Sequence, residues 1–146
     1  MKSLCILMAS LWCLAGCKKE AAVAPSIDAA FNQSVTLRYQ QRAALPNQGT
    51  PELTVTVDDV VDTRCPEGVN CLQPGDVQTV LGVRDQNGTG QVLTLQLEGR
   101  SSSVDSTAVQ ANGRQYTIVL QEVTPYPKTT DVAKKDKRVV LVVKRR

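Results

Sequence analysis

Over most of its length, the sequence alternates apolar and polar residues with a period of two. Leu53, Val55 and Val57 alternate with polar side chains, and similar alternation recurs over residues 91–98 and 115–123. Successive side chains of a β-strand point to opposite faces, so this period indicates strands with one buried face. No segment shows a convincing 3.6-residue period of an amphipathic helix. The chain is therefore expected to form an all-β domain.

Turn residues separate the predicted strands. Asn87-Gly88 lies between strands near 76–85 and 91–98, and Asn112-Gly113 precedes the strand at 115–123. Asn-Gly favours a type I′ hairpin turn because both central residues of that turn have a positive φ. About seven such strands predict a single antiparallel β-sandwich over residues 34–146, with a small β-barrel as the alternative. The other predicted strands lie near 35–40, 53–58, 106–110 and 139–143.

The first sixteen residues differ from the rest of the chain. Lys2 gives a short positive region, residues 3–16 are uncharged and mostly apolar, and the small residues Ala15 and Gly16 precede Cys17. This arrangement is typical of a secretory signal peptide. A membrane-spanning helix is a less favoured interpretation, because a bilayer core requires about 20 apolar residues.

The segment Leu14-Ala15-Gly16-Cys17 resembles the end of a bacterial lipoprotein signal peptide. In that family the signal is cut before the cysteine, which then carries the lipid, so the resemblance implies lipid attachment at Cys17. Lys18 is not the aspartate that marks retention at the inner membrane, which favours the outer membrane, facing the periplasm. We expect residues 17–33, which are alanine-rich and contain Pro25, to form a flexible tether. An ordinary cleaved signal peptide without a lipid is the alternative.

The positions of the five cysteines suggest one disulfide. Cys5 and Cys13 lie in the predicted signal peptide, and Cys17 is assigned to the lipid. Cys65 and Cys71 are then the two thiols left, and an exported chain meets an oxidising compartment. We therefore expect a Cys65–Cys71 disulfide, which stabilises so short a ring by about 2 kcal/mol on a chain-entropy estimate. Two sulfurs without a histidine do not predict a zinc site.

The residues around this pair carry a second resemblance. Asp62-Thr63-Arg64-Cys65-Pro66 followed by Val69-Asn70-Cys71 is similar to the Asp-Ser-Arg-Cys-Pro and Val-x-Cys signature of a set of small bacterial exported proteins and lipoproteins. Thr63 keeps the hydroxyl group of the serine in that signature, whereas Gln73 stands where tryptophan is common. The resemblance implies the fold and export, and it implies no particular activity.

Three residues at this ring are candidate site residues. Asp62 is placed to accept hydrogen bonds from ring amides or to pair with Arg64, and a buried pair would fix the ring against the sheet. Glu67 lies within the ring, where a binding loop would present it to a partner. We favour bracing over binding for this group. The binding interpretation stays open, because a rigid loop loses little conformational entropy when it binds.

Composition narrows the classes of function. The chain has no histidine, which removes the commonest general base and metal ligand. Four aromatic residues outside the predicted signal peptide are too few for a platform that stacks nucleic-acid bases. Residues 131–146 hold seven basic residues against Asp131 and Asp136. We interpret them as solvated hairpin lysines or edge-strand lysines rather than as a nucleic-acid contact.

These observations predict a lipid-anchored bacterial envelope protein with a non-enzymatic binding or structural role. The expected partners are the membrane, through the lipid at Cys17, and an envelope protein, with no small-molecule substrate, nucleic acid, metal or other cofactor. The alternative is an inhibitor of a periplasmic hydrolase that presents the Cys65–Cys71 loop. An enzyme is the least favoured interpretation, because no nucleophile with a base or oxyanion motif is visible.

Overall fold

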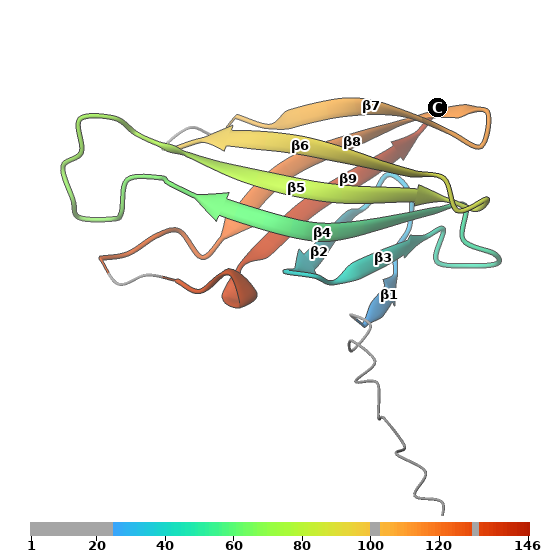
Figure 1. Ribbon diagram of the computed structural model, residues 1–146, viewed down its shortest axis with the longest axis horizontal. Helices are drawn as coiled ribbons and strands as arrows, with labels where there is room; N and C mark the ends of the chain where they lie inside the picture. The colour runs from blue at the N-terminus through green and yellow to red at the C-terminus, as the bar shows by residue number, and fades with distance from the viewer. Residues whose placement is uncertain (1–24, 100–102, 130–131) are drawn as a thin grey trace, which may run out of the picture.

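The computed structural model describes residues 25–99, 103–129 and 132–146. Within these ranges the chain forms two β-sheets packed face to face, with one 3₁₀ turn, η1 (Lys134–Asp136) (Figure 1). The strands are β1 (Ser26–Asp28), β2 (Ser34–Arg38), β3 (Arg42–Leu45), β4 (Leu53–Asp62), β5 (Asp76–Asp85), β6 (Gly90–Glu98), β7 (Asp105–Ala111), β8 (Arg114–Thr124) and β9 (Arg138–Arg145). The five-stranded sheet has the order β1-β3-β4-β5-β6, and the four-stranded sheet has the order β2-β9-β8-β7.

The predicted all-β sandwich is confirmed. Each of the seven predicted strands is present, as β2 and β4 to β9, and all of these strands pair with antiparallel neighbours. Neither sheet closes on itself, so the small-barrel alternative is wrong. In the part of the chain that the structure describes, no helix has the length and apolar character needed to cross a membrane.

The sequence does not predict β1 and β3. Three consecutive residues of β3 are buried, so this strand lacks the alternation by which the others are recognised. β1 pairs in parallel with β3, and Ala29 after it is buried. The folded domain therefore includes residues 26–33, which were predicted to belong to the tether, instead of starting at residue 34. The predicted signal peptide, Cys17 and the earlier part of the tether lie outside the described residues.

The hydrophobic core lies between the two sheets. Among the described residues, Tyr116 is the largest fully buried side chain, and its ring stacks on Phe31 with ring centroids 5.8 Å apart. Each fully buried Leu, Val or Ile contributes about 1.5–3 kcal/mol relative to an exposed one. The alternating pattern thus places one face of nearly every strand in a shared core. Its largest other fully buried members are Leu37, Leu45, Leu53, Leu81, Leu95, Ile118, Leu120 and Leu141.

The two Asn-Gly turns differ in type. Asn112 and Gly113 have φ values of 54° and 68°, as a type I′ turn requires. In the other turn, Gly88 has a positive φ and Asn87 does not. There the carboxylate of Asp85 accepts the backbone N–H groups of Asn87 and Thr89, which stabilises a longer loop. The hairpin position is confirmed in both cases, whereas the predicted type I′ conformation is confirmed only at Asn112-Gly113.

Candidate functional site

The candidate site lies at the end of the sandwich where β4 stops and β5 begins (Figure 1). Residues 63–75 join these strands, and we call them the cysteine loop. Cys65 and Cys71 form a disulfide there, with Cα atoms 5.9 Å apart, which fits the pairing expected from the sequence. Asp62 and Arg64 lie where β4 passes into this loop.

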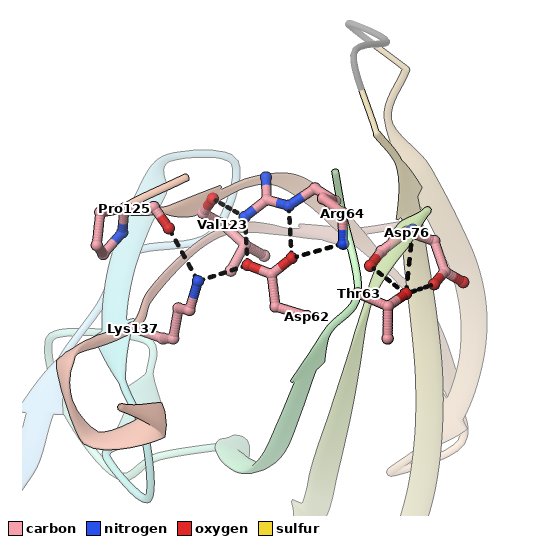
Figure 2. A network of polar contacts seen from close by, with 7 residues as sticks. All are labelled: Asp62, Thr63, Arg64, Asp76, Val123, Pro125 and Lys137. Atoms are coloured by element: carbon pink, nitrogen blue, oxygen red, sulfur yellow. Dashed lines mark hydrogen bonds and ion pairs between the residues drawn. The ribbon is translucent and has the colours of Figure 1, made fainter. Parts of the chain in front are cut away.

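Asp62 is the centre of a buried group of charges (Figure 2). Its Oδ1 accepts a hydrogen bond from Nε of Arg64 at 2.8 Å, and its Oδ2 accepts one from Nη2 at 2.7 Å. This bidentate geometry suits the planar guanidinium. The ammonium group of Lys137 also donates to Oδ2. The side chains of Asp62 and Arg64 are each 7 % exposed and that of Lys137 is 4 % exposed, so these three residues form what we call the Asp62 network.

The Asp62 network joins the two sheets. Asp62 ends β4 in the five-stranded sheet, whereas Lys137 directly precedes β9 in the four-stranded sheet. Nη2 of Arg64 donates to the carbonyl oxygen of Val123 in β8 at 3.0 Å, and Nζ of Lys137 donates to that of Pro125 at 3.0 Å. Two carbonyl groups at the end of β8 are thereby satisfied by cationic donors. The network therefore fixes the root of the cysteine loop to both layers of the sandwich.

The protonation state of Asp62 follows from these contacts. Burial raises the pKa of the carboxyl group, but hydrogen bonds and charges from Arg64 and Lys137 outweigh burial and hold the pKa below its ordinary value. Asp62 is therefore ionised at neutral pH, with both oxygens occupied by cationic donors. A carboxylate in this state is a poor general base. Its chemistry here is to bind the two cations and brace the loop.

A second set of contacts holds the stem of the cysteine loop. The backbone N–H of Thr63 donates to the carbonyl oxygen of Asp76 at 2.8 Å, and that of Cys65 donates to the carbonyl oxygen of Pro74 at 2.8 Å. The hydroxyl group of Thr63 donates to Oδ1 of Asp76 at 2.6 Å (Figure 2). Gly75 has a φ of +66° and packs directly against the Thr63 carbonyl group. These contacts together extend the pairing of β4 and β5 into the cysteine loop.

Glu67, the third predicted site residue, does not join the Asp62 network. Its side chain is exposed, and its backbone N–H donates to the carbonyl oxygen of Pro127 at 3.0 Å. The ring of Tyr126 lies over the guanidinium of Arg64, whose Cζ atom is 4.4 Å from the ring centroid. The segment after β8 thus supports the loop through one backbone bond and one cation–π contact, and the Glu67 carboxylate faces solvent.

The outer part of the cysteine loop is exposed and partly apolar. Leu72 is 102 % exposed and Val69 is 38 % exposed. A single exposed apolar residue is ordinary on a protein surface. Here both residues lie on a loop that is fixed at its stem and closed by a disulfide. We call Val69 and Leu72 the apolar tip.

Sequence reasoning missed two members of the site, Lys137 and Tyr126. Lys137 lies 75 residues after Asp62, within the basic segment that was interpreted as solvated hairpin or edge-strand lysines. That interpretation is wrong for Lys137, which is buried, and β9 lies between β2 and β8 rather than at a sheet edge. The available signal was the period of two: Lys137 lies two residues before Val139, the first residue of the all-apolar run at 139–143, and therefore on the same face of an extended chain.

Within the described ranges, no three His, Cys, Asp or Glu side chains come together as a metal site would require. No protein-family model, curated protein or solved structure matches this chain. The function is therefore inferred from the cysteine loop, the Asp62 network and the N-terminal residues.

Proposed function

We propose that this chain is a lipid-anchored protein of the bacterial envelope with a non-enzymatic binding or structural role. The signal-like residues 1–16 and the Leu-Ala-Gly-Cys segment support export and lipid attachment at Cys17. The favoured location is the outer membrane, facing the periplasm, because Lys18 follows the cysteine. In this account the sandwich is a rigid scaffold, and the cysteine loop is the surface that meets an envelope protein.

The observation that carries this proposal is a rigid loop with an exposed apolar tip. The Asp62 network, the stem bonds and the disulfide restrain the loop at its stem and across the ring from Cys65 to Cys71. Binding to a pre-organised loop avoids the ordering cost of about 0.5–1.5 kcal/mol for each side chain that would otherwise be immobilised. Leu72 projects from this support with its whole side chain exposed. A partner that buries this apolar side chain gains the free energy of removing its surface from water.

Anchoring would strengthen such an interaction. A lipid at Cys17 confines the domain to a layer beside the membrane, which raises its effective concentration toward any partner in the same layer. One acyl chain gives only marginal membrane binding, and stable anchoring requires a further chain or another signal. The several chains that the lipoprotein resemblance implies would meet this requirement. A weak contact at the apolar tip is then sufficient for stable association.

We expect Leu72→Asp to lower capture of an envelope partner by about tenfold or more, because an apolar anchor is replaced by a charge. The measurement is chemical crosslinking in intact envelopes, followed by quantitative pull-down of the tagged, anchored chain. Val92→Asp is the matched control, since Val92 is 72 % exposed and lies on β6, away from the loop. Equal capture by all three proteins, or capture of nothing except the chain itself, contradicts a binding role for the loop.

The same loop supports a second candidate function, inhibition of a periplasmic hydrolase. An exposed segment closed by a disulfide is a form that inhibitors use to present residues to an enzyme cleft. A panel of proteases and lysozymes assayed with the purified protein distinguishes the two candidates. Inhibition that disappears on reduction of Cys65–Cys71 or in a Glu67→Ala variant favours the inhibitor, and an unaffected panel rejects it.

A further inference from the structure

A cluster of cations lies apart from the cysteine loop, beside the first described residue of the chain. Arg38 at the end of β2, Lys135 in η1 and Arg138 at the start of β9 line one surface hollow together with Pro25 and three other residues. All three cationic side chains are exposed. We call Arg38, Lys135 and Arg138 the basic patch.

The charges of the basic patch are not balanced within the described residues. None of its three members forms an ion pair there, and the nearby Asp136 of η1 forms none with them. At the opposite end of β9, by contrast, Arg145 pairs with Glu52 at 2.6 Å. Arg38 and Arg138 are also direct cross-strand partners in the β2–β9 pairing. Like charges placed opposite each other destabilise a sheet, so an external anion would relieve this repulsion.

The position of the basic patch relates it to the predicted anchor. Pro25 lines the same hollow, and its carbonyl oxygen accepts a hydrogen bond from the backbone N–H of Arg42. Pro25 follows Cys17 by eight residues, a distance of at most about 28 Å along a fully extended chain. β1 and η1 lie on the same lower side of the molecule in Figure 1, whereas the cysteine loop projects from its left end.

We propose that the basic patch docks on the anionic phospholipid headgroups of the membrane that holds the Cys17 lipid. This inference depends on the proposed lipid anchor. The short connection lets the three cations reach the headgroups, where a negative surface attracts lysine and arginine within about one Debye length, roughly 8 Å at physiological salt. Docking at this side leaves the cysteine loop pointing along the membrane rather than into it. The patch thus sets the orientation in which the loop meets its partner.

The test compares two lysines of the full protein, purified from envelopes and mixed with lipid vesicles. One set of vesicles contains phosphatidylcholine alone, and the other contains phosphatidylcholine with one third phosphatidylglycerol. An amine-reactive reagent is applied, and modification of Lys135 and Lys144 is followed by mass spectrometry. Lys144 is exposed near the other end of β9 and serves as the internal control. We expect the reaction rate of Lys135 to be lower by about threefold or more in the anionic vesicles. The rate of Lys144 should be the same in both kinds of vesicle.

High salt is expected to remove this protection of Lys135, since exposed charges are screened. The variant Arg38→Gln/Arg138→Gln is expected to remove it at low salt while Lys135 itself is retained. Equal Lys135 rates in both vesicles, or protection of Lys144 instead, overturns the docking proposal and leaves the anchor intact. A chain that does not enter either kind of vesicle overturns the anchor, and the docking proposal with it.

Discussion

Replacing Asp62 with asparagine is expected to lower the free energy of unfolding by about 3–5 kcal/mol at neutral pH, because it leaves two buried cations without their carboxylate. Arg64 and Lys137 both donate to Asp62, and their side chains are 7 % and 4 % exposed. Neither cation can turn to water without leaving the carbonyl groups of Val123 and Pro125. Urea unfolding of wild-type and variant proteins measures the difference.

The difference in unfolding free energy between the wild-type and Asp62→Asn proteins should become smaller as the pH falls. The pKa of Asp62 is lowered in the folded protein, so the unfolded chain takes up a proton more readily than the folded one. The stabilisation is therefore complete above the ordinary aspartate value of about 3.9 and is lost as the pH falls through the lowered pKa. Asp59, whose pKa is also lowered, is present in both proteins and cancels from the comparison.

Asp58→Asn is the matched control for this substitution. Asp58 lies on the same strand, is exposed, and forms no ion pair with a described residue. Its loss should change stability by about 0.5 kcal/mol or less. If Asp62→Asn lowers the free energy of unfolding no more than this control does, or if its effect is unchanged at low pH, the Asp62 network does not brace the loop.

Gly75→Ala is expected to destabilise the protein by about 3 kcal/mol, through backbone strain and a steric clash together. Gly75 has a φ of +66°, a conformation that residues with a Cβ atom rarely adopt. A Cβ atom there would overlap the carbonyl oxygen of Thr63 and lie 2.9 Å from the Cα atom of Arg64. Both neighbours are backbone, so neither can rotate away. Urea unfolding again provides the measurement.

Gly88→Ala separates the two causes. Gly88 has a φ of +85°, but an added Cβ atom would meet nothing within 4 Å. This variant carries the backbone strain without the clash and should lose about 1 kcal/mol. Equal losses for the two variants would mean that the stem around Gly75 adjusts freely, which contradicts a rigid cysteine loop.

The fold follows from the sequence wherever a strand has one face in the core. Such strands alternate, as Leu53, Val55 and Val57 do in β4, and local turn residues mark their ends. β3 does not alternate because Ala43, Ala44 and Leu45 are all buried. β1 is three residues long and depends on β3 for its pairing. Neither strand carries a period that a short window can detect, so the sequence predicts a domain that begins too late, at residue 34.

The site follows from the sequence only where its members are close along the chain. Asp62 and Arg64 are two residues apart, and their pairing was one of two arrangements considered from the sequence. Lys137 reaches the same carboxylate from the other sheet, and that contact exists only because the sandwich places the end of β4 beside the start of β9. A sequence records the charge of Lys137, but its burial is a product of the tertiary fold.

The cysteine loop, which the Asp62 network supports, and the basic patch have separate roles. The Asp62 network is buried, so its contribution to function is indirect: it holds the cysteine loop in place. The basic patch is exposed, so its removal should leave stability nearly unchanged. The effects of variants in the Asp62 network and in the basic patch can therefore be measured independently. Loss of the network should lower folding stability and partner capture together, whereas loss of the patch should change orientation at the membrane, and through it partner capture, without loss of folding stability.

The most direct test of the central claim, an exported and lipid-anchored domain with a braced loop, is the intact mass of the protein isolated from the envelope of the cells that produce it. We predict a chain that begins at Cys17, carries acyl groups on that residue and holds Cys65 and Cys71 as a disulfide. A chain that retains residues 1–16, an unmodified Cys17, or two free thiols at positions 65 and 71 would contradict the account.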